Sequence, residues 1–232
     1  MTTALDLVAA TALGAVLCTA VPLAAGAESA SAEYAIRWNA RDGGPASGNE
    51  TMAILKTRAT RPRKFNVDYY DLPSTMTAPP GFSMILRRRV EDGRRTELTW
   101  KLRGDHAAAD WACPLRNPRQ SKAEIDVAFG GADAVTRAYS YSCTSDDADL
   151  AASELSATIR PCTAAVTRRD AGSLKIEEWR LPGNVLIIDV SLGGKDTPGA
   201  LDQFRTRIAE PLLAAGIVPL ADSKSELGSR CR

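Results

Sequence analysis

The chain has 232 residues, of which 44% are hydrophobic and 25% are charged, as in an ordinary globular protein. This composition excludes a disordered chain, a collagen-like repeat and a polytopic membrane protein. Lys and Arg total 29 against 28 Asp and Glu, and a net charge of +1 favours neither a nucleic-acid partner nor an acidic tail. Any electrostatic function must therefore arise from charges that the fold sorts in space.

The first 27 residues have the character of an export signal. Residues 7–25 are Ala-, Leu- and Val-rich and uncharged, and the Ala-Gly-Ala tripeptide at 25–27 is typical of a cleavage site. No Lys or Arg precedes this run, although a signal peptide usually begins with positive charge. The alternative is an uncleaved anchor, because 19 apolar residues are marginally long enough to span a bilayer. We predict a signal peptide over 1–27, one domain over 28–232, and a periplasmic or secreted protein.

Four cysteines follow the predicted signal: Cys113, Cys143, Cys162 and Cys231. An even number of cysteines in an exported chain predicts disulfides, so we expect two bonds among these four. Four cysteines allow three pairings, and their spacing does not choose among them. The chain has no CxxC pair, which argues against a zinc site or a thioredoxin-like redox site.

The predicted elements are mostly short strands, joined by turns and three helices. The strands are expected over 32–39, 65–71, 82–90, 94–103, 122–129, 136–143, 162–169, 174–181 and 185–192. The helices are expected over 48–59, over 146–158 and after Thr197. Ser47 and Glu50 fit a capping box, and Thr197-Pro198 fits an N-cap followed by proline at N1. Asp92-Gly93 predicts a hairpin turn, and no repeat or linker divides the chain.

Several of these strands separate apolar from charged residues. In 94–103, Leu98, Trp100 and Leu102 fall on one face, and charged residues such as Lys101 fall on the other. The same alternation recurs over 82–89, 123–129 and 185–191. One interpretation is an antiparallel sheet with one solvated face. The other is a closed barrel, apolar outside where helices cover it and charged inside.

The order of short motifs along the chain resembles the CYTH, or triphosphate tunnel, superfamily. The motifs are Glu33-Tyr34-Ala35-Ile36-Arg37, Tyr69-Tyr70-Asp71-Leu72-Pro73, Leu86-Arg87-Arg88-Arg89, Leu98-Thr99-Trp100-Lys101, Glu124-Ile125-Asp126 and Asp189-Val190-Ser191. The resemblance runs from about residue 33 to 191. It implies an α+β fold, an eight-stranded antiparallel β-barrel with helices packed outside.

The resemblance also implies roles for inward-facing residues. Those expected to bind phosphate are Arg37, Arg87, Arg89 and Lys101, and those expected to bind a divalent metal, Mg²⁺ or Mn²⁺, are Glu33, Glu124, Asp126 and Asp189. The chain departs from the family pattern at Ala35 and Ser191, where carboxylates are expected. Metal chemistry is therefore expected to be weakened more than anion binding, and no residue is assigned a catalytic role.

Three functions remain open. The first is an exported domain that binds a small phosphate-rich polyanion with weak or no catalysis. The second is a metal-dependent hydrolase of inorganic or organic triphosphates. The third is a disulfide-braced structural protein of the envelope. None of the three predicts a nucleic-acid partner, or a membrane partner beyond the export signal.

Overall fold

The computed structural model describes residues 30–91, 95–108, 111–131, 134–146 and 148–229. The predicted export signal, the Asp92-Gly93 turn and Cys231 lie outside these ranges. Among the described residues, no helix is both long enough and apolar enough to cross a membrane.

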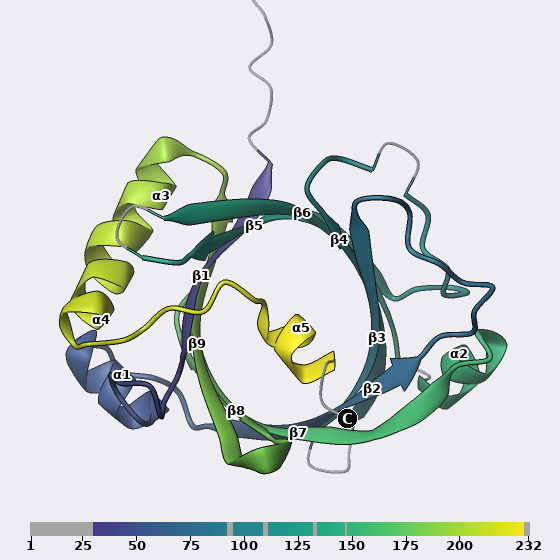
Figure 1. The fold of residues 1–232 in the computed structure, drawn as a ribbon, viewed down its shortest axis with the longest axis horizontal. Helices are drawn as coiled ribbons and strands as arrows, with labels where there is room; N and C mark the ends of the chain where they lie inside the picture. The colour runs from purple at the N-terminus through teal and green to yellow at the C-terminus, as the bar shows by residue number, and fades with distance from the viewer. Residues whose placement is uncertain (1–29, 92–94, 109–110, 132–133, 147, 230–232) are drawn as a thin grey trace, which may run out of the picture.

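The described residues form nine strands that close into a barrel (Figure 1). The strands are β1 (Ser31–Asn39), β2 (Arg63–Asp71), β3 (Phe82–Glu91), β4 (Arg95–Gly104), β5 (Gln120–Phe129), β6 (Val135–Ser145), β7 (Thr158–Ala171), β8 (Leu174–Leu181) and β9 (Val185–Lys195). Their order around the barrel is β1-β5-β6-β4-β3-β2-β7-β8-β9. Long-range pairing of β1 with both β5 and β9 closes the ring.

The expected eight-stranded antiparallel barrel is wrong in strand number and in direction. The barrel has nine strands among the described residues, and β1 runs parallel to β5, with Glu33 opposite Asp126. All the other neighbouring pairs are antiparallel. A ring with an odd number of strands cannot alternate direction all the way round, so at least one pair must run parallel. The residue patterns, which predict nine strands, therefore give the correct strand number, whereas the family resemblance does not.

Helices cover two regions of the outer wall (Figure 1). The helical segments are α1 (Gly48–Ile54), α2 (Ala148–Glu154), α3 (Pro198–Phe204), α4 (Glu210–Ala214) and α5 (Lys224–Ser229), with a 3-10 turn at Pro182–Asn184 and a π-helical turn at Arg205–Ala209. Phe204 and Leu212 bury the apolar outer face of β1, including Tyr34 and Trp38. A second apolar cluster lies between α2 and β4, where Leu98 and Leu102 are buried.

The predicted signals at two helix starts are confirmed. The Ser47 hydroxyl accepts a hydrogen bond from the Glu50 amide at 3.2 Å, at the start of α1. The Thr197 hydroxyl accepts one from the Ala200 amide at 3.2 Å, and Pro198 occupies the first turn of α3. Each bond satisfies an amide that the helix leaves without an internal partner. Local sequence therefore determines where these helices begin.

The first helix ends earlier than expected. The predicted range was 48–59, but α1 ends at Ile54. Lys56 adopts a left-handed backbone with φ of 49°, and the Thr57 amide donates to the Met52 carbonyl at 3.0 Å. A left-handed residue followed by such a backward bond is a common way of ending a helix.

The C-terminal helix α5 lies inside the ring of strands (Figure 1). Leu227 of α5 and Leu220 before it pack against a third apolar cluster. That cluster consists of Phe65, Val67, Tyr69, Cys162, Ala164, Val166, Trp179 and Ile187. The expectation of a charged interior therefore holds for only part of the barrel, because one stretch of the inner wall is apolar and is filled by α5.

One predicted disulfide is confirmed within the described residues. Cys113 and Cys143 are bonded, with their Cα atoms 6.0 Å apart. Cys162 is also disulfide-bonded. The bond from Cys113 ties the segment after β4 to the C-terminal part of β6, beside the apolar cluster under α2.

Candidate functional site

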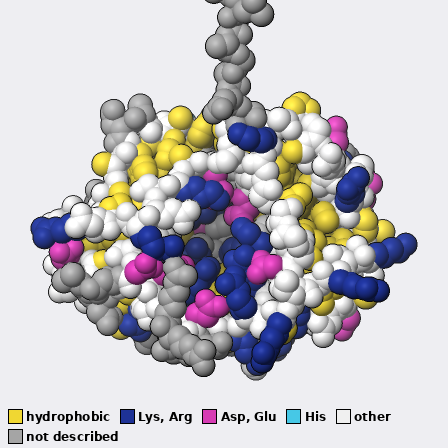
Figure 2. Space-filling view, turned by 180° about the vertical axis from the view of Figure 1, so that it is seen from behind, with side chains coloured by type: hydrophobic (Ala, Val, Ile, Leu, Met, Phe, Trp, Pro, Cys, Tyr) yellow, Lys and Arg dark blue, Asp and Glu magenta, His cyan; other side chains and the backbone are white. Residues whose placement is uncertain are grey.

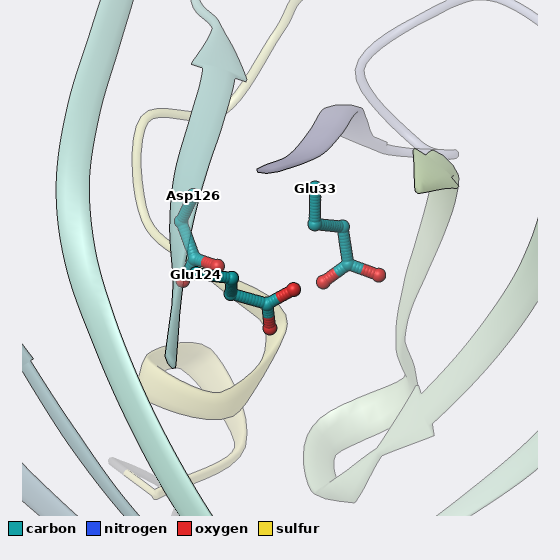
Figure 3. Close-up of side chains that lie close together, drawn as sticks. All are labelled: Glu33, Glu124 and Asp126. Carbon is teal, nitrogen blue, oxygen red and sulfur yellow. The ribbon is translucent and has the colours of Figure 1, made fainter. Parts of the chain in front are cut away.

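Three acidic side chains from two neighbouring strands meet inside the barrel, and we call them the acidic triad: Glu33, Glu124 and Asp126. Glu124 and Asp126 share one face of β5 because residues two apart on a strand point the same way. The parallel register places Glu33 of β1 opposite Asp126. Ligand atoms of the three carboxylates all lie within 4.8 Å of one another, and Figure 3 shows the Glu33 and Glu124 side chains pointing toward one another. The parallel pair of strands therefore assembles the triad.

Cationic side chains surround the acidic triad. The contacts are Lys101 Nζ to Asp126 Oδ2 at 3.1 Å, Arg103 Nε to the same oxygen at 3.2 Å, Lys175 Nζ to Glu33 Oε1 at 3.3 Å, and Lys122 Nζ to Glu124 Oε2. Seen from the side opposite α5, the centre of the molecule is hollowed, and Lys, Arg, Asp and Glu side chains gather there (Figure 2). The barrel thus has an open end with charges of both signs.

The triad carboxyls differ in their affinity for protons. Burial raises the pKa of Glu33, but the positive charges of Lys224 and Lys175 outweigh it and hold this pKa well below its usual range. Burial and the nearby Glu33 carboxylate raise the pKa of Glu124, and the ammonium of Lys122 only partly offsets this. A second positive charge near Glu124 would therefore favour its ionised form.

The donor atoms of the triad fit a hard divalent cation. Mg²⁺ and Mn²⁺ prefer oxygen ligands, and the triad offers carboxylates from two strands. Asp126 is 8% exposed, and its Oδ1 atom is buried with no hydrogen-bond partner in the part of the chain that the structure describes. A buried acceptor without a donor is costly, so a bound cation would stabilise this oxygen. The residues present therefore fit a metal ion.

Asp189 is not a member of the triad, although it borders the same small cavity as Glu33 and Asp126. It belongs to a group that we call the Lys224 network: Arg37, Glu177, Asp189 and Lys224. Asp189 is fully buried and pairs through Oδ1 with Arg37 Nε at 2.8 Å and through Oδ2 with Lys224 Nζ at 2.9 Å. Glu177 of β8 lies opposite Asp189 of β9, and its Oε2 atom is 2.7 Å from Lys224 Nζ. Both oxygens of Asp189, and the guanidinium of Arg37, are thus engaged within the protein.

The Lys224 network stabilises its charges mutually. Burial would raise the pKa of Glu177, but Lys224 outweighs it and lowers this pKa to about 2, and the indole of Trp179 donates a hydrogen bond to Glu177 Oε2 at 3.0 Å. Burial would lower the pKa of Lys224, but Asp189 and Glu177 raise it. Glu177 and Lys224 therefore hold each other in their charged forms.

Two arginines predicted to bind phosphate share the inner face of β3. Arg87 Nη1 donates to Ser225 Oγ of α5 at 2.9 Å, and no carboxylate contacts its guanidinium within the described ranges. Arg89 lies over the Phe65 ring, 4.4 Å from its centroid, and pairs with Glu97 at 3.3 Å. Burial and the like charge of Arg87 lower the pKa of Arg89. Of the four predicted cations, Arg37, Arg89 and Lys101 have acidic partners and Arg87 does not.

Several charged residues of the interior were not among the predicted site residues. Lys122 and Arg103 could have been found from alternation, since each lies two residues from a predicted site residue on its strand. Lys224 had no such signal, because α5 has only six residues and its position inside the barrel is a tertiary fact.

No family model and no curated protein matches this chain. Solved structures that resemble it include the PH1819 protein from Pyrococcus horikoshii, with 12% identity, a TM-score of 0.49 and coverage of 84% of this chain and 97% of that one. A proposed adenylate cyclase from Vibrio parahaemolyticus has 14% identity, a TM-score of 0.48, and coverage of 84% and 96%. Likenesses at these values identify no shared activity. The closed barrel with helices outside fits the CYTH-like architecture that the motif order implied, and no family match assigns the chain to that superfamily.

Proposed function

We propose that the open end of the barrel binds a short phosphate-rich anion together with a divalent cation. The observation that carries this proposal is the acidic triad, whose carboxylates lie beside Lys101, Arg103, Lys122 and Lys175. Carboxylates recruit the cation, and the basic side chains together with the cation attract phosphate oxygens. A site for a cation alone would not need the basic side chains, and a site for an anion alone would not need the carboxylates.

Glu33, Glu124 and Asp126 would hold the cation, Mg²⁺ or Mn²⁺. When bound, such an ion polarises phosphoryl groups and offsets their charge. Lys122 and Lys175 would then be released in part from their carboxylate partners, because the cation takes over their role. Each lysine freed in this way is a further donor for the anion.

Arg87 and Arg89 would hold the phosphate oxygens. Two guanidiniums on one strand face repel each other, and an anion between them removes that repulsion. The planar fork of arginine binds phosphate through paired hydrogen bonds, which favours this role over that of a structural ion pair. Arg87 is the stronger candidate, because its guanidinium contacts a serine hydroxyl and no described carboxylate.

Binding is favoured over rapid turnover. Asp189 is committed to Arg37 and Lys224, and the inward positions at Ala35 and Ser191 carry no carboxylate. Three carboxylates remain to hold metal and to offset charge in a transition state. Hydrolysis of a triphosphate is the second candidate, and it is supported by the three carboxylates of the triad, which lie close enough together to hold one metal ion.

The anion site is tested by thermal unfolding with tripolyphosphate and Mn²⁺. Ligand that binds only the folded state raises the melting temperature by roughly 2–4 °C for each kcal/mol of linkage free energy. Arg87→Ala combined with Arg89→Ala should abolish the shift. The matched control is Arg88→Ala on the same strand, since Arg88 points the other way and pairs with Asp68 at 3.0 Å. An unchanged shift in the double variant would overturn the assignment of these arginines.

The metal site is tested by Mn²⁺ binding, followed by electron paramagnetic resonance. Asp126→Asn should weaken binding by about tenfold or more, since an amide is a poorer ligand than a carboxylate for a hard cation. Asp202→Asn, on the exposed side of α3, is the control. Equal affinity in both variants would place the ion elsewhere. No ion binding and no thermal shift would favour a structural role in the envelope.

A further inference from the structure

A row of outward-facing residues crosses the outer wall of the barrel. Strand register aligns, side by side, Val90 of β3, Asn66 of β2, Ala165 of β7, Arg180 of β8 and Leu186 of β9. Their sequence neighbours on β2, β7, β8 and β9 belong to the third apolar cluster, inside the barrel. Because successive residues of a strand point to opposite faces, the row itself faces outward.

Two adjoining hollows lie along this row, and we call them together the outer groove. The first, of about 390 Å³, is bordered by Lys64, Ala165 and Arg180. The second, of about 350 Å³, is bordered by Arg180, Leu186 and Arg41. Arg180 borders both hollows, so they are continuous along the row. Figure 1 shows no described helix outside β7 between α1 and α2, so this part of the wall is accessible.

The charged side chains that border the outer groove are all basic. They are Arg41, Lys64 and Arg180, all three are exposed, and no Asp or Glu of the described ranges borders either hollow. Neither Lys64 nor Arg41 has an ion-pair partner in the part of the chain that the structure describes. The outer groove therefore presents positive charge to solvent.

The one carboxylate that reaches Arg180 is shared. Glu178 Oε2 lies 3.4 Å from Arg180 Nη2, and Glu178 Oε1 pairs with Arg169 Nη1 at 2.6 Å and accepts from the Gly48 amide at 3.0 Å. One carboxylate thus offsets two guanidiniums. Arg180 remains 62% exposed, so it can pair with a second carboxylate from outside.

The floor between these cations is short and mixed in character. Ala165 contributes only a methyl group between the long side chains of Lys64 and Arg180, and Leu186 adds an aliphatic surface. The Asn66 amide has no hydrogen-bond partner among the described residues. A closed barrel has no free strand edge, so a partner cannot extend the sheet and must be recognised through such side chains.

We infer that the outer groove binds an extended acidic segment of a partner protein. Carboxylates of the segment pair with the three basic side chains, its aliphatic side chains lie on Ala165 and Leu186, and the Asn66 amide bonds to its main chain. The row crosses five strands about 4.8 Å apart, a length of roughly 19 Å, which about six extended residues span.

The form of the outer groove favours a peptide over other anionic partners. A membrane surface is flat and would touch the basic rim without reaching the floor. A polyanion such as heparin would use the cations and leave the aliphatic floor uncovered. A second copy of this chain in a two-fold contact would place one basic groove against another, and like charges repel.

Charge is tested by fluorescence anisotropy with two labelled peptides of about six residues at ~0.15 M salt, one alternating Asp and Val and the other alternating Lys and Val. We expect saturable binding of the acidic peptide, and binding of the basic peptide weaker by about tenfold or more. Lys64→Glu with Arg180→Glu should weaken the acidic peptide to a similar degree. Arg207→Glu, an exposed arginine of the π-helical turn, is the control and should change nothing.

Shape is tested by Ala165→Phe, which fills the first hollow without changing charge. We expect the affinity for the acidic peptide to fall about tenfold or more, with an unchanged melting temperature because the position is exposed. Ala123→Phe, at an exposed position of β5, is the matched control.

No saturable binding of the acidic peptide, or equal binding of both peptides, would overturn the inference. Heparin binding in that case, if lost in the Lys64→Glu, Arg180→Glu variant, would assign the surface to polyanions. An acidic peptide that binds the Ala165→Phe and Ala123→Phe variants equally would be held by charge alone, and would overturn the outer groove as its site. The inference is independent of the proposed function, so the thermal shift with tripolyphosphate and Mn²⁺ should be unchanged in Ala165→Phe.

Discussion

The two ends of the barrel interior contain the same kinds of side chain in different states. At the end filled by α5, the buried residues Arg37, Glu177 and Asp189 form a balanced network with the mostly buried Lys224. In the acidic triad, lysines and Arg103 pair with the carboxylates, but the Asp126 Oδ1 atom is buried without a hydrogen-bond donor among the described residues. Alternation along the strands points the strand residues of both groups inward, and α5 adds Lys224. Within the described ranges, only the triad leaves a buried carboxylate oxygen without a hydrogen-bond donor. Incomplete pairing, and not charge itself, distinguishes the site from the scaffold.

The largest expected effect comes from breaking the filled end. Lys224→Met leaves Glu177 buried without its ammonium partner and Asp189 with Arg37 alone, and removing one partner of a buried ionic group costs about 3–5 kcal/mol. Denaturant unfolding should show a loss of this size. Lys224→Met combined with Glu177→Gln should recover part of it, because one uncompensated charge is removed. Lys64→Met, exposed on β2, is the control, and a Lys224→Met variant as stable as this control would contradict the balanced network.

The disulfides give the next effect. Cys113–Cys143 lies on the outer wall, whereas Cys162 lies inside, its Sγ atom 3.6 Å from the Gly228 carbonyl oxygen of α5. Mass spectrometry of the mature protein should find two bonds, the second joining Cys162 to Cys231. Each bond should contribute roughly 2–4 kcal/mol. Four free thiols in exported material would contradict both the pairing and the predicted compartment.

The pH dependence of stability separates the two ends further. The folded-state pKa of Glu177 is about 2, below its ordinary value of 4.5. Its contribution, on the order of 3 kcal/mol, is therefore present above pH 4.5 and is lost as the pH falls toward 2. Glu124 acts in the opposite direction, because its pKa is raised. Unfolding free energy measured across this range should fall less steeply for Glu177→Gln than for the unmodified protein, and parallel curves would contradict the low pKa.

The smallest expected effect is on catalysis at the open end. We expect slow or absent hydrolysis of tripolyphosphate and nucleoside triphosphates with Mg²⁺, and at most modest hydrolysis with Mn²⁺, since Ala35 and Ser191 supply no carboxylate. Ala35→Glu with Ser191→Glu should raise phosphate release, at some cost in stability because both positions are buried. Asp126→Asn is the inactive control. Fast turnover by the unmodified protein, lost in that control, would favour the hydrolase.

The sequence by itself determined which side chains share a face of each strand. Period-two alternation placed Leu98 and Trp100 on one face and Lys101 on the other, and the structure shows that the first face packs under α2 while Lys101 contacts Asp126. The helix starts at Ser47 and Thr197 were likewise local, because a side-chain cap acts within a few residues. The nine strand segments were also visible, since each carries its own pattern.

Only the tertiary structure decided how those strands meet and which charges remain available. The parallel pairing of β1 with β5 joins segments about ninety residues apart and assembles the triad, and no local pattern encodes such a contact. The placement of α5 in the lumen was equally hidden, because a short helix is stabilised by what it packs against and not by its own propensity. Since α5 supplies the partner that engages Glu177 and Asp189, the division between structural and available charge is a property of the assembled barrel.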